Sequence, residues 1–229
     1  MKAMILAAGR GERMRPLTDN TPKPLLKVGG KPLIVWHLES LSKAGIKEVV
    51  INHAHLGEQI VNTLGNGQQW GMSIQYSAEK IALETAGGIA KALPLLGDET
   101  FLVVNGDIYT DLDFSGCQMR ASTMQQQNKL AHLFLVDNPA QHAQGDFALN
   151  AGLVSAEGQS KLTFSGVGIY HPYLFASVEQ GQPAKLAPIL REAMVQHQVS
   201  GEYYCGEWHD IGTPERLSAL DLQLRYAIK

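Results

Sequence analysis

The sequence predicts an α/β fold, in which a Rossmann-like, mostly parallel central sheet is flanked by helices and carries a smaller antiparallel flap. Short apolar runs typical of buried strands alternate with helix-like segments through the first half of the chain. This alternation is typical of a parallel sheet with helices on both faces. The second half instead contains several short strand-like runs separated by turns. The 229 residues are 45% hydrophobic and 18% charged, which is enough apolar side chain for a sizeable core.

The first half is expected to contain alternating strands and helices. The segment 32–44 is typical of a helix, with Pro32 in its first turn and Gly45 as its stop. The run at 101–105 is apolar up to its final Asn105, so we expect it to be a central strand. Thr85 is expected to cap a helix that ends before Pro94. The expected strands are 4–6, 48–52, 72–76 and 101–105, and the expected helices are 32–44, 56–64 and 86 to about 93.

The second half is more mixed. We expect strands at 130–136, 153–155, 162–164 and 167–170, and helices at 187–196 and from 214 to the C-terminus. The polar stretch 124–128 is predicted to be an exposed loop. No internal repeat is present, so an added hexapeptide-repeat β-helix module is not expected. We therefore predict a single domain over residues 1–229, with one half at about 1–110 and a second at about 111–229.

Composition excludes several classes of protein. The formal net charge of −3 argues against a nucleic-acid binder, which usually has a basic excess. The two cysteines, Cys117 and Cys205, do not indicate a disulfide scaffold and favour a reducing compartment. The N-terminal apolar run is too short for a signal peptide, and no run is long enough to span a membrane. The expected location is the cytoplasm, and the oligomeric state is left open.

The most informative segment is the loop that follows the first strand. Glycines at 9 and 11 let backbone N–H groups approach phosphates, and nearby cations can neutralise them. A Walker loop is excluded because no Gly-Lys-Ser/Thr ending exists. The dinucleotide fingerprint is also a poor match, because Met14 stands where a third small residue is needed and Pro16 follows soon after.

A third phosphate-binding pattern fits this segment. The stretch Leu6-Ala-Ala-Gly-Arg-Gly-Glu-Arg-Met-Arg-Pro-Leu-Thr18, followed by Pro22-Lys-Pro-Leu25, closely resembles the signature of the sugar-1-phosphate nucleotidylyltransferases. The resemblance implies the fold of the nucleotide-diphospho-sugar transferases, with a nucleotide-binding first half and a sugar-phosphate-binding second half. The family more often has Thr at position 12. Glu12 would be repelled by phosphates unless it faces away or meets a metal.

The loop and its surroundings provide the candidate nucleotide-binding and catalytic residues. Lys23 is held between two prolines and Arg15 directly precedes Pro16, so both backbones are restricted. The resemblance implies that both cations contact phosphates, and we predict Arg15, Lys23 and Asp107 as catalytic residues. Small residues near position 87, within the stretch Glu84-Thr-Ala-Gly-Gly88, could read a nucleobase edge. The predicted nucleotide-binding residues are Ala7, Ala8, Gly9, Gly11, Glu12, Arg13, Lys23 and Gly87.

Two acidic residues are candidates for a metal site. Asp107 follows a glycine at the end of a buried strand, where a carboxylate is costly unless a cation meets it. Asp210 stands in a Trp-His-Asp-Ile-Gly-Thr stretch that resembles a second family motif. The resemblance implies that Asp107 and Asp210 bind Mg²⁺, which prefers oxygen ligands. Asn105, Asp146 and Ser165 are predicted to bind the sugar phosphate.

The expected reaction is nucleotidyl transfer from a nucleoside triphosphate to a sugar 1-phosphate. The attacking phosphate oxygen is already ionised near neutral pH, which agrees with a chain that has carboxylates and cations but no obvious nucleophile and base pair. Further stretches, such as residues 51–54 and 163–166, resemble the family's uridylyltransferases of bacterial cell-wall recycling, which implies UTP. A guanylyl- or thymidylyltransferase for another hexose or heptose 1-phosphate stays open, as does a non-catalytic relative that senses sugar nucleotides.

Overall fold

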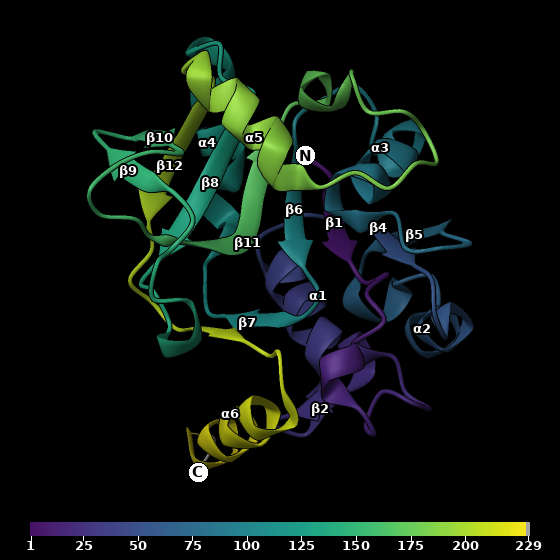
Figure 1. Ribbon diagram of the computed structural model, residues 1–229. Coiled ribbons are helices and arrows are strands. Elements are labelled where there is room, and N and C mark those ends of the chain that lie inside the picture. The colour runs from purple at the N-terminus through teal and green to yellow at the C-terminus, as the bar shows by residue number, and fades with distance from the viewer. Residues whose placement is uncertain (228–229) are drawn as a thin grey trace.

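The computed structural model describes residues 1–227 and contains one mixed nine-stranded sheet with helices on both faces (Figure 1). The strand order is β5-β4-β1-β6-β11-β8-β12-β10-β9. The fold class predicted from the sequence is therefore confirmed. The strands of this sheet are β1 (Ala3–Leu6), β4 (Glu48–His53), β5 (Ser73–Ala78), β6 (Phe101–Asn105), β8 (Ala131–Val136), β9 (Ala148–Asn150), β10 (Leu153–Ser155), β11 (Thr163–Tyr170) and β12 (Val199–Tyr203).

The first half builds the parallel part of the sheet. Strands β4, β1 and β6 run parallel to one another, and β5 is parallel to β4. The alternation of side chains along each strand sends Ile5 to one face and Met4 to the other, so both faces need a cover. Strand β6 lies between β1 and β11, in the interior of the sheet as its apolar sequence predicts.

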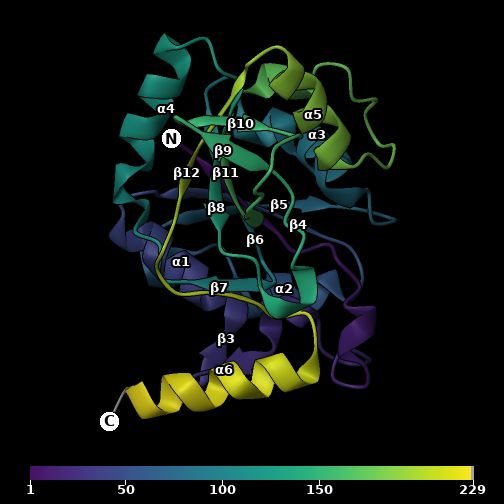
Figure 2. The ribbon, with the colours of Figure 1, turned by 60° about the vertical axis from the view of Figure 1, so that its left-hand side comes forward.

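Helices cover the two faces of this sheet in separate groups. One face packs against α1 (Leu33–Lys43), α2 (Gly57–Leu64) and α4 (Cys117–Gln126). The opposite face packs against α3 (Glu84–Leu96) and α5 (Leu186–Val195), and Figure 2 shows these two helices across the sheet from α1 and α4. The result is a three-layer arrangement that leaves the carboxyl ends of β1, β4 and β6 open for the loops that follow them.

The second half extends the same sheet and does not fold away from it. Strand β11 runs antiparallel to β6 and to β8, while β12 runs parallel to β8. The short hairpin β9–β10 closes the edge and supplies the expected antiparallel flap. The separately predicted strands 162–164 and 167–170 are one strand, β11, whose register shifts between Phe164 and Gly168.

Two element predictions were wrong. The stretch 124–128 is not wholly a loop, because α4 continues to Gln126 and buries Met124. Its glutamines face solvent, which gave the segment a loop-like composition. Thr85 is not a helix cap, since α3 already begins at Glu84 and continues through Pro94 to the buried Leu96.

Two small sheets and the last helix complete the fold below the main sheet (Figure 2). Leu220 and Leu224 of the last helix pack in a small apolar cluster with Val28 and Met14, which ties the end of the chain to the N-terminal loop.

Within the described residues, the helices are all too short or too polar to cross a membrane. The remaining elements are β2 (Lys27–Val28) with β3 (Lys31–Pro32), β7 (Ile108–Thr110) with β13 (Trp208–Asp210), and α6 (Pro214–Ala227). The last two residues of the helix predicted from 214 onward lie outside the described residues.

Candidate active site

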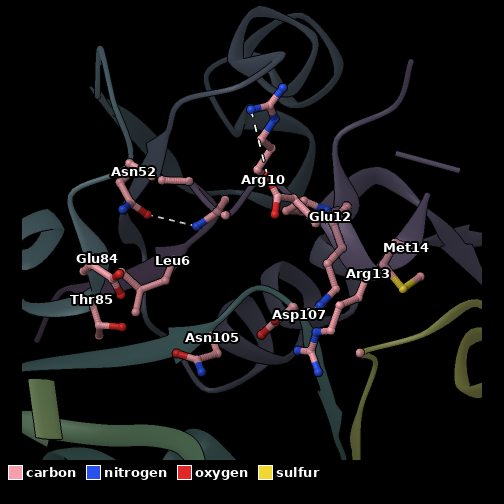
Figure 3. A pocket seen from close by; sticks show the side chains of 18 residues that line it. Leu6, Arg10, Glu12, Arg13, Met14, Asn52, Glu84, Thr85, Asn105 and Asp107 are labelled. Atoms are coloured by element: carbon pink, nitrogen blue, oxygen red, sulfur yellow. Dashed lines mark hydrogen bonds and ion pairs between the residues drawn. The ribbon is translucent and has the colours of Figure 1, made fainter. Parts of the chain in front are cut away.

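A cavity of about 500 Å³ opens at the carboxyl ends of β1, β4 and β6. Figure 3 shows Glu84 and Thr85 on one side of it, Arg13 on the other, and Asn105 and Asp107 between them. Most of the residues predicted to bind nucleotide meet here, together with residues that the prediction did not name. The lining consists of Leu6, Ala7, Ala8, Gly9, Arg10, Gly11, Glu12, Arg13, Met14, Lys23, Pro24, Asn52, Ala82, Glu84, Thr85, Asn105, Asp107 and Gly212.

The glycine-rich loop is shaped by close backbone packing at Gly11. This residue has φ +66°, and an added Cβ would lie 3.0 Å from Thr18 Cγ2 and 3.2 Å from Lys23 Cβ. Thr18 Oγ1 donates a hydrogen bond to the Gly11 carbonyl over 2.8 Å. Only glycine meets both demands at once, because other residues adopt this conformation at a cost and need space for a side chain. At Gly9, by contrast, an added Cβ would meet no heavy atom within 4 Å. The backbone there is open to a ligand.

Lys23 is the cation most firmly placed in the cavity. Its side chain is only 8% exposed, and Nζ lies 2.8 Å from Asp107 Oδ2. Arg10 and Arg13 also line the cavity. Arg15 does not: its Nε pairs with Asp19 Oδ1 at 3.2 Å, outside the lining residues. The cations that face the cavity are therefore Lys23, Arg10 and Arg13.

Asp107 and Asp210 are brought together by the pairing of β7 with β13. Asp210 is opposite Ile108 in this ladder, and the Ile211 N–H donates to the Asp107 carbonyl over 3.1 Å. Asp210 Oδ2 accepts a hydrogen bond from Arg216. An added Cβ on the lining residue Gly212 would lie 3.2 Å from Asp210 Oδ2, which places that carboxylate at the margin of the cavity.

The donor chemistry of these two acids fits a magnesium ion that is completed by substrate. Their side chains are 41% and 29% exposed, so their oxygens are accessible. Among residues 1–227, no group of three or more His, Cys, Asp or Glu side chains could hold a metal by itself. Magnesium is commonly bound by one or two carboxylates plus phosphate oxygens and water, so two acids at the margin of a cavity of about 500 Å³, large enough for a nucleotide, fit such an ion.

The residues predicted for the sugar phosphate lie in different settings. Asn105 lines the cavity, directly before the Gly106-Asp107 turn. Asp146 is engaged by His142 Nε2 at 3.0 Å and by the Phe164 N–H at 2.8 Å, so its carboxylate holds the start of β11. Ser165 is buried, and its carbonyl accepts a hydrogen bond from Trp208 Nε1 over 2.7 Å. Asp146 and Ser165 are not among the lining residues.

The segment that begins α3 forms the opposite wall. Glu84 has φ +59°, a conformation that glycine adopts most readily. This chain adopts that backbone conformation with a glutamate, which has a side chain to accommodate. Gly87 lies behind the wall, where its N–H donates to the Ala184 carbonyl over 3.1 Å and an added Cβ would approach Gln182 O to 2.4 Å. Its role in this structure is close packing, and it does not line the cavity.

A comparison of the chain with models of protein families shows the family to which it belongs. The model of the nucleotidyl transferase family matches residues 2–153, which include the glycine-rich loop, Lys23 and Asp107. The chain belongs to the nucleotidyl transferase family. The match covers the parallel half of the sheet and continues to β10.

Relatives of this nucleotidyl transferase cover nearly its whole length. It is 57% identical over 221 residues to the N-acetylmuramate alpha-1-phosphate uridylyltransferase of Neisseria meningitidis serogroup B, with 95% of each chain covered. It is 33% identical to the protein of the same name from Caulobacter vibrioides, covering 98% of this chain and 97% of that one. A crystal structure from Bacillus anthracis, described as a glucose-1-phosphate thymidylyltransferase in complex with sucrose, is similar with a TM-score of 0.85. At 23% identity over 98% of this chain and 95% of that one, it shows the shared fold alone.

The prediction from sequence missed Asn52 as a lining residue of the nucleotidyl transferase. Its Oδ1 accepts a hydrogen bond from the Ala7 N–H over 2.9 Å, at the point where the glycine-rich loop begins. The available signal was the same one that identified Asn105: a polar residue at the carboxyl end of an apolar strand. The buried Glu79, which accepts a hydrogen bond from Asn52, had no such signal, because the strand before it, Ser73–Ala78, mixes polar and apolar residues.

Proposed function

We propose that this chain transfers a uridylyl group from UTP to N-acetylmuramate α-1-phosphate, giving UDP-N-acetylmuramate and pyrophosphate. The observation that carries the reaction type is the cavity itself, which joins a glycine-rich loop, a buried lysine and an accessible aspartate. The sugar and the nucleotide are proposed from the two uridylyltransferases that are similar along nearly their whole length. We further propose a cytoplasmic role in cell-wall recycling, which agrees with the two free cysteines.

The chemistry requires alignment and charge neutralisation more than proton transfer. An oxygen of the sugar phosphate attacks the α-phosphorus of UTP, a new P–O bond forms, and the bond to pyrophosphate breaks. The attacking oxygen is already ionised, so no general base is needed. Lys23 and Arg13 face the space in which the triphosphate would lie and would stabilise the charge that develops on the leaving pyrophosphate.

We propose that Asp107 and Asp210 hold Mg²⁺ when substrate is bound. The ion would neutralise charge on the substrate phosphates. Before substrate arrives, Asp107 holds the buried Lys23 side chain in place through the 2.8 Å ion pair. Asp107 would thus act on the phosphates both directly and through the lysine.

The predicted substrate contacts remain part of the proposal. Ala7 and Ala8 would flank one face of the uracil, and the Glu84–Thr85 wall would bound the other. Asn105 would contact the sugar 1-phosphate, with Asp146 and Ser165 shaping the backbone behind it. Arg15 would need to leave Asp19 in order to reach the phosphates, so we propose Arg13 as the arginine in contact and keep Arg15 as the competing prediction.

A matrix of substrates tests the proposed function. Pyrophosphate release is measured with UTP, dTTP and GTP against N-acetylmuramate, glucose, mannose and heptose 1-phosphates, each with and without Mg²⁺. We expect the largest kcat/KM for UTP with N-acetylmuramate 1-phosphate and none without the ion. A preference for another pair would overturn the substrate assignment, and Mg²⁺-independent turnover would overturn the metal assignment.

Asp107→Asn separates the reaction from folding in the same assay. This variant keeps the shape of the side chain but weakens both metal binding and the ion pair with Lys23, so turnover should be lost while the circular dichroism spectrum is retained. Pyrophosphate release at the wild-type rate by Asp107→Asn would remove Asp107 from the catalytic machinery. A sensing relative without catalysis would bind UTP and release no pyrophosphate under any condition.

A further inference from the structure

Two buried polar side chains lie at the ends of neighbouring parallel strands, and the first of them also lines the cavity. Asn52 is the next-to-last residue of β4 and is 2% exposed. Glu79 directly follows β5 and is 6% exposed. Asn52 Nδ2 donates to Glu79 Oε1 over 2.7 Å. Removing a carboxylate from water is costly unless hydrogen bonds compensate it, so the position of Glu79 calls for an explanation.

The remaining hydrogen bonds of this pair connect the two walls of the cavity. On one side, Asn52 Oδ1 accepts from the Ala7 N–H over 2.9 Å, and Ala7 begins the glycine-rich loop. On the other side, Glu79 Oε2 accepts from the Leu83 N–H over 2.9 Å, and Leu83 directly precedes α3. A continuous chain of hydrogen bonds therefore runs from Ala7 through both side chains to Leu83. Figure 3 shows the first of these bonds as a dashed line from Asn52, on the same side of the view as Glu84.

Helix α3 is seated directly on this pair. An added Cβ on Gly88 would lie 2.8 Å from Asn52 Nδ2 and 2.8 Å from Glu79 Oε1. Such distances are shorter than any normal contact, so the absence of a side chain at Gly88 is what lets the helix approach. The second glycine of the Gly87-Gly88 stretch thus belongs to the same arrangement as the two polar side chains.

The donor and acceptor pattern leaves little freedom. Both oxygens of Glu79 accept from N–H donors, which an ionised carboxylate does and an amide cannot. The Asn52 amide is also oriented, because its oxygen faces Ala7 N and its nitrogen faces Glu79.

We propose that Asn52 and Glu79 are positioning residues that set the spacing between the Ala7–Ala8 wall and the Glu84–Thr85 wall, and so the fit of the nucleobase. The proposal rests on the proposed function, because these are the walls assigned to the uracil. Neither side chain needs to touch the phosphates. Their loss should weaken recognition of the base while leaving recognition of the triphosphate tail largely intact.

The test compares two single variants with their double variant. In Glu79→Gln an amide donor must face either Asn52 Nδ2 or Leu83 N, and in Asn52→Asp two carboxylates meet in a buried site. In the double variant Asn52→Asp/Glu79→Gln, the aspartate accepts from Ala7 N and from the glutamine amide, while the glutamine oxygen accepts from Leu83 N. Every partner is satisfied again, and the total charge equals that of the wild type.

Binding of UTP and of inorganic tripolyphosphate is measured by calorimetry, together with KM for each substrate and the melting temperature. We expect each single variant to lose about fivefold or more in UTP affinity, since a buried polar group without its partner costs at least about that factor. Tripolyphosphate affinity should change by less than about twofold, and the KM for the sugar 1-phosphate should change little, because phosphate contacts act at other side chains. The double variant should recover UTP affinity to within about threefold of the wild type, since matched partners restore the network.

Glu202→Gln is the matched control. Glu202 is also a partly buried carboxylate with two N–H donors from Arg120, but it lines a different cavity of the chain. This variant should lower the melting temperature without changing UTP affinity. The proposal is overturned if Glu79→Gln weakens UTP and tripolyphosphate equally, or if the double variant is no better than the poorer single variant. If wild-type protein binds UTP through this pair but does not turn it over, the proposed function fails and the positioning role stands.

Discussion

At the scale of single residues, Lys23 is the side chain on which the site's electrostatics depend most. Prolines on both sides restrict its backbone, and a short 3-10 helix over Lys23–Leu25 follows Pro22. The ammonium group is buried yet remains paired with Asp107. A cation prepared in this way is already partly dehydrated and oriented before a polyphosphate arrives, which strengthens its attraction to the ligand.

We predict that Lys23→Ala lowers kcat/KM for UTP by about 100-fold or more, the loss typical of removing one preorganised transition-state contact. The melting temperature should fall little, because Asp107 is 41% exposed and can be hydrated once its partner is gone. Steady-state kinetics and thermal unfolding measure the two quantities. Lys31→Ala, at a lysine paired with Glu39 away from the cavity, is the control. Parallel losses of activity and stability in Lys23→Ala would indicate a structural lysine.

A second prediction separates the two arginines of the loop. Arg13 lines the cavity and Arg15 pairs with Asp19 outside it. Arg13→Ala should therefore reduce kcat by about 100-fold, while Arg15→Ala should reduce it by less than about fivefold, because only the first removes a cation from the reacting phosphates. Pyrophosphate release at saturating substrate measures both. A larger loss for Arg15→Ala would restore the role that the sequence predicted for it.

At the scale of secondary-structure elements, the irregularity of β11 connects the second half of the chain to the site. Gly166 lies at the register shift of this strand and has φ +82°. An added Cβ there would lie 2.6 Å from Asn105 Nδ2. The strand therefore contacts the side chain of Asn105 directly, which positions that amide at the cavity.

Gly166→Ala should lower stability by about 1–3 kcal/mol, because alanine adopts a positive φ at a cost and here also contacts Asn105. Displacement of Asn105 should raise the KM for the sugar 1-phosphate. Gly152→Ala is the matched control, since Gly152 has φ +80° and an added Cβ would meet nothing within 4 Å. Denaturant titration and kinetics are compared for the two variants. If both raise the KM equally, the contact with Asn105 is not the cause.

At the scale of the whole molecule, two partly or fully buried groups couple the fold to pH. Burial lowers the pKa of His37, on α1, from 6.5 to about 4, and its Nε2 lies 2.9 Å from the Ile108 carbonyl next to Asp107. Glu202 joins β12 to α4 and β8. Its desolvation raises the pKa, but His132, whose Nε2 lies 3.4 Å from Oε2, and the hydrogen-bonded Arg120 outweigh this and lower the pKa from 4.5 to about 2.

We predict two windows of acid destabilisation. Both groups release protons more readily when folded, so each contributes stability at high pH that is lost as the pH falls. For His37 the loss occurs as the pH falls from 6.5 to about 4, and for Glu202 as it falls from 4.5 to about 2. In melting curves against pH, His37→Gln should flatten the upper window and Glu202→Gln the lower one. A wild-type slope that persists unchanged in both variants would assign the effect to other groups.

Before any folding, the sequence determined the order and type of the main strands and helices of the first half and of β8, β10, β11, α5 and α6, because hydrophobic periodicity and glycine or proline stops are local properties of the chain. It indicated the glycine-rich loop, Lys23, Asn105 and Asp107, since each lies next to a strand end or a proline that marks its position.

The sequence missed the strands β2, β3, β7, β9, β12 and β13 and the helix α4, and it misplaced the start and the end of α3. The polar surface of α4 gave that helix the composition of a loop, although burial of Met124 stabilises it. For α3, the sequence indicates Thr85 as the cap and Pro94 as the stop, although burial of Leu96 extends the helix past the proline.

Only the tertiary structure decided which side chains meet. Asp107 and Asp210 are neighbours because β7 pairs with β13, and Asn52 and Glu79 connect the walls because β4 and β5 end side by side. Arg13 faces the cavity and Arg15 does not, although both belong to one basic loop. The physical reason is that hydrogen bonds and ion pairs act over about 3 Å in space. The separation of two residues along the chain does not tell whether they lie that close in space, because the pairing of the strands determines it.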